Sequence, residues 1–435
     1  MQNKILARSG WYIIIILSLA PSAFWFLELP ISARFSGASE ATQSLGQIAG
    51  LTGMAMFSLM IILSARLKIF EKVFAGINEA YVAHHFFGGL TFCLLLFHPL
   101  LLAYQYLQIS SRAAALFLLP SAYWPQNFGI IALLITTVTL VITFYIKLKY
   151  QIWKFTHKFM GLAFIFAFFH VFLIGSNVGS NQLLRTYLFI LGMVAIAAFL
   201  YRAMFGNYFI RRIPYVVEGV DALPDKIFEV KLVPLGQEMK FVPGQFVFVK
   251  FYSNALTREA HPFSMSSANG NQLKFGIKES GDYTSNIGKL KVGDKAEIEG
   301  PFGAFSFRNH SNRKQGWIAG GVGVTPFMSM LRSLNGEDSG FMIDFYYCVK
   351  DEAGFAFRAE IEEIVKKNKN LRVIFWTTDT MGFINSKAIK NKTPDINNRD
   401  VLICGPDIMM SELKKQFLKQ GINKNQIHTE EFKLY

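Results

Sequence analysis

Four histidines lie in two long apolar stretches of the first half of the chain, as two pairs of nearly equal spacing. His84 and His98 are 14 residues apart, and His157 and His170 are 13 residues apart. At about 1.5 Å of rise per residue, the members of each pair lie about 20 Å apart along a helix. Because ionisable side chains are costly inside lipid, imidazoles at two matched depths predict a ligand that they bind jointly. The pattern favours axial ligation of two stacked haem irons, each by one histidine from each stretch.

The choice of ligands within these pairs depends on the angular phase of a helix. At about 100° per residue, 14 steps fall about 40° short of four turns, and 13 steps fall about 140° short. His84 is therefore favoured over its rival His85, which is 13 residues from His98. The second pair requires its helix to bend, to unwind locally or to present its haems differently, and Gly161 is the expected weak point. The nearby Lys158 would either snorkel toward the membrane surface or pair with a haem propionate.

The stretches that carry the histidines belong to a set that predicts an all-α, six-helix transmembrane bundle over residues 1–213. The chain is 52% hydrophobic, and each stretch is long and apolar enough to span a bilayer. The first could instead be a cleaved signal peptide, because Lys4 and Arg8 precede an apolar core that small residues follow. The six stretches are roughly 11–29, 44–65, 81–105, 128–146, 155–175 and 184–205.

Basic residues alternate between the loops of this half. Twelve Lys and Arg would lie on one side of the membrane and three on the other, which puts both termini in the cytoplasm. A multi-pass protein of the inner, cytoplasmic membrane is expected. Residues 1–213 hold 15 Lys and Arg against 4 Asp and Glu, so they carry +11 of the chain's net +14. The positive charge therefore reports membrane topology and gives no reason to expect a nucleic-acid partner.

The second half begins with alternating strands and turns, and residues 214–314 predict a small antiparallel β-barrel with one helix near 283–290. Hydroxyls and backbone amides around a glycine turn and a helix start are what a flavin and its pyrophosphate require. The strings that offer these groups are 243–246 (Pro-Gly-Gln-Phe), 261–267 (His-Pro-Phe-Ser-Met-Ser-Ser), 281–285 (Gly-Asp-Tyr-Thr-Ser) and 300–303 (Gly-Pro-Phe-Gly).

From residue 315, strands and helices alternate, which predicts an α/β nucleotide-binding domain over 315–435. A strand at 317–319 leads into Gly-Gly-Val-Gly-Val-Thr-Pro at 320–326, and a helix follows to about residue 334. Glycines let a diphosphate approach the backbone, and the helix N-terminus supplies partial positive charge. Later strands end at 346–350 and 403–406, and the ligand is expected at such strand ends.

Cysteine usage fits a cytosolic dehydrogenase half. The three cysteines, Cys93, Cys348 and Cys404, form no Cys-x-x-Cys pair. This argues against an iron–sulfur cluster or a zinc site supplied by the chain, and Cys93 is expected to be a membrane packing residue.

Taken in order, the strings of the second half resemble the ferredoxin-NADP reductase superfamily. Fused to a six-helix domain, they make the chain similar to the NADPH oxidase and ferric reductase family. The most specific features are the histidine separations of 14 and 13, His-Pro-Phe-Ser at 261–264, Gly-Gly-Val-Gly-Val-Thr-Pro at 320–326 and Cys-Gly-Pro at 404–406. The resemblance implies a bis-haem domain at 1–213, an FAD domain at 214–314 and an NAD(P) domain at 315–435.

The resemblance also implies a flavin site. Ser264 would lie near the reactive edge of the isoalloxazine, and Thr284 with its neighbours would hold the pyrophosphate. A C-terminal aromatic would stack on the flavin, and Phe432 is the natural match, with Tyr435 as competitor. The full set expected to bind FAD is His261, Pro262, Phe263, Ser264, Ser267, Gly281, Thr284 and Ser285.

For the nicotinamide cofactor, the resemblance implies a glycine cradle and a strand end beside the reactive ring. Lys350 lies where relatives often have a basic residue that contacts the 2′-phosphate, which favours NADPH over NADH modestly. Arg358 is a weaker candidate for the same contact. The cradle residues are Gly320, Gly321, Gly323, Thr325 and Pro326, and those beside the nicotinamide are Cys404, Gly405 and Pro406.

The implied activity moves electrons from cytosolic NAD(P)H through FAD and two b-type haems to an acceptor outside the membrane. Dioxygen, giving superoxide, is favoured by the spacing of 14 and 13, and a ferric chelate is nearly as well supported. Leu102, one turn past His98, weakens the superoxide assignment, because oxygen-reducing animal members have a polar residue near there. An electron-acceptor protein outside the membrane is a third option. A transporter or proton pathway using the membrane histidines is the alternative of another class.

Overall fold

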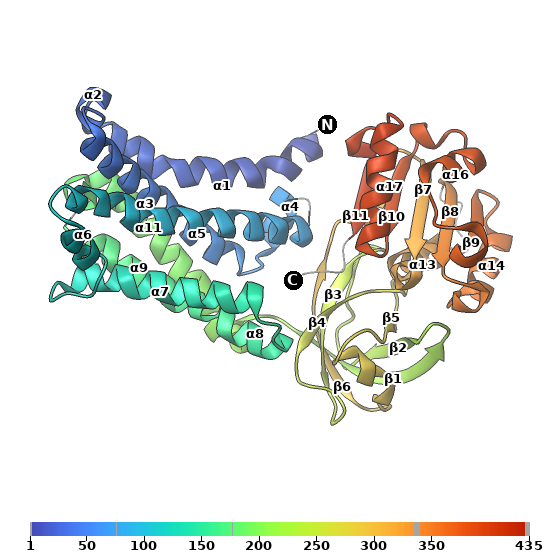
Figure 1. The fold of residues 1–435 in the computed structure, drawn as a ribbon. Coiled ribbons are helices and arrows are strands. Elements are labelled where there is room, and N and C mark those ends of the chain that lie inside the picture. Colours follow the sequence, from blue (N-terminus) through green and yellow to red (C-terminus); the bar gives the residue numbers. More distant parts are fainter. Residues whose placement is uncertain (1, 75, 176, 335–339, 431–435) are drawn as a thin grey trace. The chain divides into compact units, whose positions relative to one another are not determined.

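The computed structural model describes residues 2–74, 76–175, 177–334 and 340–430 of the chain. These residues fall into two compact units, Met1–Ile210 and Arg211–Tyr435. The first unit is helical and the second combines two sheets with helices (Figure 1).

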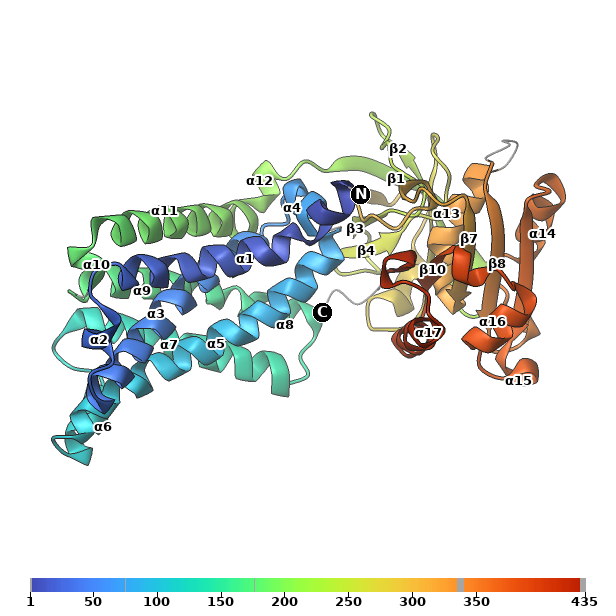
Figure 2. The same ribbon diagram turned by 90° about the horizontal axis from the view of Figure 1, so that it is seen from above.

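Within the described residues, six helical spans are long and apolar enough to cross a membrane, which confirms the predicted bundle (Figure 2). They are Ser9–Phe26 of α1 (Gln2–Phe26), α3 (Ala38–Leu63), α5 (Ile77–Leu107), α7 (Trp124–Tyr145), α8 with α9 (Tyr150–His157 and Phe159–Leu173) and α11 with the π-helix η1 (Gln182–Phe199 and Leu200–Met204). Shorter helices are α2 (Ile31–Arg34), α4 (Lys68–Phe74), α6 (Ser111–Phe117), α10 (Asn177–Ser180) and α12 (Gly206–Phe209).

Helix α3 is the most enclosed span of the bundle. About two thirds of it (67%) is buried, against 17–33% of the other spans. Small residues on α3 allow this, because a Cβ added at Gly53 would lie 2.8 Å from Leu95 of α5. Close approach of helices at small residues is the usual way in which membrane helices pack.

The fifth span is interrupted between α8 and α9 at Lys158, one residue after His157. The amide of Lys158 donates to Phe155 and its carbonyl accepts from Gly161, so the chain tightens locally before it continues. The predicted interruption therefore occurs, but Gly161 is not its location. A Cβ at Gly161 would lie 2.1 Å from Phe199 of α11, so this glycine serves a helix contact.

The second unit opens with an antiparallel sheet whose described strands follow the order β4-β3-β6-β1-β2-β5. Its core is formed by inward residues such as Val247, Val249 and Phe275. The strands are β1 (Ile213–Leu223), β2 (Ile227–Pro234), β3 (Phe246–Tyr252), β4 (Ala260–Ser264), β5 (Leu273–Lys278) and β6 (Lys295–Phe302), with the 3-10 helix η2 (Thr284–Lys289) before β6.

This sheet corrects the expectation of a closed barrel. Between the end strands β4 and β5, the described residues form one isolated bridge, Met265 to Phe275, in place of a ladder. The alternation of apolar residues was sufficient to predict antiparallel strands. It could not reveal whether the two end strands pair, because that depends on contacts between segments distant in sequence.

The rest of the unit is a parallel sheet of order β11-β10-β7-β8-β9 in the described part of the chain. Successive β7 residues face opposite sides: Trp317 packs toward α13 and α14, and Ile318 toward α16 and α17. The strands are β7 (Lys314–Gly320), β8 (Met342–Val349), β9 (Leu371–Thr377), β10 (Asp400–Cys404) and β11 (Ile427–Glu430). The helices are α13 (Thr325–Leu334), α14 (Arg358–Lys367), α15 (Thr378–Met381), α16 (Ser386–Lys392) and α17 (Asp407–Lys419), with 3-10 turns η3 (Phe307–Asn309), η4 (Gly321–Val324), η5 (Glu352–Gly354), η6 (Ile396–Asn398) and η7 (Lys424–Gln426).

Arg332 of α13 joins the two sheets of this unit. Its guanidinium donates to both carboxylate oxygens of Glu360 on α14 at 2.7 Å and to Glu229 of β2 at 2.8 Å. It also donates to the backbone carbonyl of Ser266, after β4, at 2.9 Å. Burial alone would raise the pKa of Glu360, but the hydrogen bonds and charge of Arg332 hold it below its usual range. The charges of this junction therefore satisfy one another.

Candidate functional site

The four membrane histidines face each other in two pairs, each drawing one ring from α5. The ring centroids of His84 and His157 are 6.4 Å apart, and those of His98 and His170 are 6.3 Å apart. His157 is the last residue of α8, and His170 lies in the last turn of α9. The structure thus brings together the predicted partners at both levels, whereas His85 is exposed.

These separations can be tested against the geometry of one metal ion between two imidazoles. A metal–nitrogen bond is about 2.0 Å and a ring centroid lies about 1.1 Å beyond the nitrogen, so two opposed imidazoles have centroids about 6.2 Å apart. The observed values of 6.4 and 6.3 Å agree with this distance. The residues present therefore fit a hexacoordinate haem iron at each level.

Backbone carbonyls orient the rings of the second pair. Nδ1 of His98 lies 2.8 Å from the carbonyl oxygen of Gly46, and Nδ1 of His170 lies 2.8 Å from that of Pro125. A carbonyl can only accept, so each Nδ1 carries the proton and each Nε2 keeps its lone pair. Carbonyl partners of this kind commonly fix the tautomer of metal-bound histidines.

The first pair differs. The backbone of Met60 lies within reach of the His84 ring, whereas Nδ1 of His157 is buried and has no hydrogen-bond partner among the described residues. The ring of His157 stacks on Trp153, with centroids 5.4 Å apart. Packing against Trp153 therefore helps to hold the His157 ring in place.

Glycines on neighbouring helices make room for the rings and were missed from the sequence. A Cβ at Gly50 of α3 would lie 2.6 Å from Nδ1 of His98, and one at Gly129 of α7 would lie 2.8 Å from Nδ1 of His170. By contrast, a Cβ at Gly88, one turn from His84, would meet nothing within 4 Å. The glycines at 46, 50 and 53 of α3 were the available signal.

On the antiparallel sheet, the expected flavin residues gather at the end of β4. Ser264 is buried there and pairs with Phe246 of β3. The ring of His261 stacks on Tyr283 with centroids 3.8 Å apart, and its Nε2 lies 3.1 Å from Glu259. Burial, followed by the charge of Glu259, raises the pKa of Tyr283, so that phenol stays neutral. Pro262 and Phe263 occupy the intervening positions of β4.

The turn before η2 is shaped by its own hydroxyls. Oγ1 of Thr284 accepts hydrogen bonds from the amides of Ser280 and Gly281, at 3.0 and 3.2 Å. Ser285 donates to the carbonyl of Gly281 at 2.5 Å. Ser267 instead accepts from the amide of Lys274 and so braces the sheet. Thr284 therefore orders the turn expected to face the pyrophosphate.

The glycine loop after β7 is tightly constrained on one side and open on the other. Gly321 has φ +54 and a Cβ there would meet nothing within 4 Å. A Cβ at Gly323 would lie 2.4 Å from the carbonyl oxygen of Cys404, so only glycine fits between this loop and β10. Gly320 similarly abuts Pro406. The open side at Gly321 leaves the loop backbone accessible there.

The start of α13 completes this loop. Oγ1 of Thr325 donates to the carbonyl of Val322 at 3.0 Å, and Pro326 is buried in the first turn. A Cβ at Gly276 of β5 would lie 2.5 Å from Cγ2 of Thr325. The helix start therefore lies directly against the antiparallel sheet.

Cys404 ends β10 beside the glycine loop, with Gly405 packed against Gly320. Its thiol is fully buried and donates to the carbonyl of Glu430 at 3.5 Å. Burial, with the nearby carboxylate of Glu430, raises the pKa of Cys404 well above its usual range. Burial therefore favours the protonated thiol, which acts as a donor here.

The remaining expected residues differ in their exposure and in their contacts. Lys350 is exposed directly after β8, available to a ligand. Arg358 is engaged by the carboxylates of Glu352 and Glu362 and lies over Phe375, which accounts for it without a ligand. Phe432 and Tyr435 lie outside the residues that the structure describes.

Family models match the chain in three consecutive segments. The ferric reductase like transmembrane component matches residues 49–168, an FAD-binding domain matches 215–312, and an oxidoreductase NAD-binding domain matches 317–415. The chain has a ferric reductase/NADPH oxidase-like architecture. It accordingly combines helices long and apolar enough to span a membrane with segments similar to FAD-binding and NAD-binding oxidoreductase domains.

Individual relatives match part of the chain. An NADH-cytochrome b5 reductase 1 from Coccidioides immitis is 26% identical over 44% of this chain and 66% of its own length. A flavohemoprotein from Bordetella pertussis is 27% identical over 45% of this chain and 54% of its own length. The chain thus covers less than two thirds of either relative. A flavohemoglobin crystal structure from Malassezia yamatoensis, with bound FAD and haem, has 18% identity and a TM-score of 0.49 over 75% of this chain and 92% of that one.

Proposed function

We propose that this oxidoreductase transfers electrons from cytosolic NADPH, through FAD and two b-type haems, to dioxygen outside the membrane, which yields superoxide. One NADPH and two dioxygen molecules would give NADP⁺, one proton and two superoxide ions. FAD supplies the conversion of a two-electron hydride into single electrons, and the haems carry single electrons across the bilayer. The observation that carries the proposal is the pair of histidine separations, 6.4 and 6.3 Å, at two levels of one bundle.

The roles of the chain's own residues follow from the contacts described. His84 with His157 would hold the inner iron, and His98 with His170 the outer one. The carbonyls that bind Nδ1 of the outer rings keep Nε2 free to ligate. Both irons would then be coordinatively saturated, so the acceptor would be reduced at the haem edge.

In the second unit, residues of the chain would bind and orient NADPH and FAD. The loop at 320–323 would hold the diphosphate of NADPH, Lys350 its 2′-phosphate, and the Cys404 end of β10 its nicotinamide. Ser264 and Thr284 would hold the flavin and its pyrophosphate. NADH remains the alternative donor, because one exposed lysine is a weak discriminator. We assign 1–213, 214–314 and 315–435 to the haem, FAD and NAD(P) domains.

The distribution of basic residues supports an orientation in the cytoplasmic membrane. Twelve Lys and Arg on one side against three on the other would place both termini and the second unit in the cytoplasm. NADPH would then be oxidised inside and the acceptor reduced outside.

The absorption spectrum of the purified full-length protein tests the haem assignment. We expect a low-spin haem spectrum beside that of flavin, which shifts when NADPH is added. His84→Ala and His98→Ala should each lose about half of the bound haem, because each removes an axial ligand from one of two irons. His85→Ala, on the exposed neighbour, is the matched control and should keep all of it. A protein that shows only flavin absorbance would refute the proposal.

The acceptor requires a separate measurement, because Leu102 favours a second candidate, ferric-chelate reduction. Leu102 lies one turn past His98 and packs near Gly46, so the surroundings of the outer level are apolar there. The rate of NADPH oxidation by membranes should be measured first with dioxygen and then with a ferric chelate as the electron acceptor. In the dioxygen assay, superoxide dismutase is added to a second sample to show whether superoxide is the product. A faster reaction with the chelate would replace the oxidase assignment by a reductase.

A further inference from the structure

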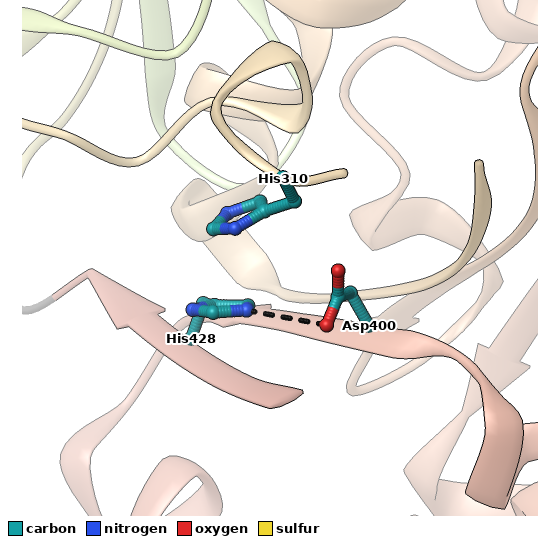
Figure 3. Close-up of side chains that lie close together, drawn as sticks. All are labelled: His310, Asp400 and His428. Carbon is teal, nitrogen blue, oxygen red and sulfur yellow. Dashed lines mark ion pairs between the residues drawn. The ribbon is translucent and has the colours of Figure 1, made fainter. Parts of the chain in front are cut away.

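A second group of metal-ligating side chains lies far from the membrane histidines in the sequence. His310, Asp400 and His428 each offer one ligand atom, and these atoms lie within 4.8 Å of one another. His310 follows η3 in the segment between the two sheets, Asp400 opens β10, and His428 lies in β11 (Figure 3). None of them belongs to the electron path proposed above.

The geometry of the three side chains is close to that of a coordination site. Nε2 of His428 lies 3.6 Å from Oδ1 of Asp400, and the rings of His428 and His310 stack with centroids 3.7 Å apart. Three ligands about 2.0–2.1 Å from a tetrahedral metal ion lie about 3.4 Å from one another. The pair of His428 and Asp400 already approaches this spacing, and a turn of the His310 ring would bring in the third ligand.

Charge also points to a cation at this place. Asp400 is buried, and within the described residues its carboxylate makes one ion pair, the 3.6 Å contact with His428. The adjacent Arg399 is engaged elsewhere, by Asp344 and Asp395. A buried carboxylate is costly unless it is paired or bound to a metal ion. Nε2 of His428 is buried as well and forms no hydrogen bond there.

We infer that His310, Asp400 and His428 bind a divalent transition-metal ion of the kind that prefers imidazole, with Zn²⁺ as the probe. Two imidazoles and one carboxylate suit zinc and its neighbours better than magnesium or calcium, which prefer oxygen ligands. The ion would tie the segment between the sheets to the starts of β10 and β11. Asp400 and Cys404 are at opposite ends of β10. The site therefore lies at the N-terminal end of this strand, and the position proposed for the nicotinamide lies at its C-terminal end. It uses no cysteine, so cysteine spacing could not reveal it.

The test measures zinc retained by the purified holoprotein after equilibration with Zn²⁺ and gel filtration. We expect one zinc per chain, bound through two imidazole nitrogens and one carboxylate oxygen in its X-ray absorption spectrum. Asp400→Asn and His428→Gln should each weaken zinc binding more than about 100-fold. Mutation of a residue that only supports a metal ligand already lowers metal affinity about 10–100-fold, and these two residues would be ligands themselves. Glu412→Gln, which removes an exposed carboxylate that pairs with Lys415, should bind zinc like the wild type.

His310→Gln separates loss of the site from loss of the fold. His310 lies between secondary-structure elements, so this variant should keep its flavin and still lose zinc. Retention of zinc by all three variants, or failure of the wild type to retain any, would overturn the inference. Neither result depends on whether the membrane histidines bind haem.

Discussion

The imidazole rings of His98 and His170 show how little space surrounds a ligand in this bundle. Each ring donates from Nδ1 to a backbone carbonyl, and each is approached by a glycine from a neighbouring helix. The histidines themselves could be predicted from type and spacing. Their carbonyl partners, Gly46 and Pro125, could not, because any residue type offers a carbonyl and only the helix packing selects which one is used.

Gly50→Ala tests this packing. The new Cβ would lie 2.6 Å from Nδ1 of His98, so the ring must shift or the helices must separate. Overpacking of this kind costs about 1–3 kcal/mol, and the haem proposed between His98 and His170 should be lost first. We expect about half of the haem to be missing from the spectrum. Gly89→Ala, where a Cβ meets nothing within 4 Å, should keep the full haem content. Equal haem loss in the two variants would contradict this account.

Cys404→Ala tests whether the buried thiol acts as a neutral group. The raised pKa keeps Cys404 protonated above the pH range in which exposed thiols ionise, about pH 8.5. A plot of the wild-type kcat/KM for NADPH against pH should therefore show no rise or fall caused by this thiol between about pH 7 and pH 9. Cys404→Ala should have the same profile shape with a lower value throughout. A limb that is present in the wild type and disappears in the variant would show that the thiol ionises.

At the scale of elements, the interruption between α8 and α9 was foreseen and its position was not. The separation of 13 residues required a change of phase, which identifies the helix that must deviate but not the residue. Gly161 was expected because glycine weakens helices. In the structure this glycine lets Phe199 of α11 approach, and the turn is tightened at Lys158, whose ammonium donates to the carbonyl of Ala203.

Gly161→Val follows from that contact. A side chain here would occupy the place of the Phe199 ring, because its Cβ would lie 2.1 Å from that ring, so α9 and α11 must move apart. We expect a loss of about 1–3 kcal/mol, read as a lower melting temperature of the detergent-solubilised protein. If Gly161 were a hinge instead, Val would stiffen α9 and leave the melting temperature unchanged or higher. Gly89→Val is the control for an added side chain on an open helix face.

The sheets show the same division between local and distant information. The loop from Gly320 to Pro326 was located from sequence, because a strand, a glycine turn and a helix start are consecutive. The contact of Gly323 with the carbonyl of Cys404 joins positions 81 residues apart (404 − 323) and required the β7–β10 pairing. The glycine loop could therefore be predicted from consecutive residues. The strand register that places Cys404 against Gly323 could not.

At the scale of the whole molecule, Arg332 links parts of the second unit that the sequence gives no reason to connect. Its partners Glu229 and Glu360 lie 103 and 28 residues away. A charged residue on a helix is usually solvated, so the sequence offered no signal for this junction. The junction matters for function because it fixes the antiparallel sheet against the helix that begins at the glycine loop.

Arg332→Met should weaken this junction. Removing the guanidinium leaves Glu229 buried without its cation, which costs about 3–5 kcal/mol for a buried pair. We expect a lower melting temperature of the second unit and a higher KM for NADPH. Arg358→Met, which breaks ion pairs on the surface, should cost about 1 kcal/mol or less. Similar decreases in melting temperature in the two variants would show that the buried ion pairs of Arg332 stabilise the protein no more than the surface pairs of Arg358 do.

The same junction predicts a dependence on acid. The pKa of Glu360 is lowered in the folded protein, so its stabilising effect is complete above the unfolded pKa and is lost as pH falls through the folded pKa. The melting temperature of Glu360→Gln should therefore lie below that of the wild type near pH 7, and the two should converge below about pH 4. A difference that stays constant with pH would refute a charge-based role.

The carbonyls behind His98 and His170 have a consequence for biogenesis. These rings would be oriented before a porphyrin arrives, whereas Nδ1 of His157 has no hydrogen-bond partner among the described residues. A preset pair of ligands loses less freedom on capture, so we expect the newly made polypeptide to fill its outer level before its inner one.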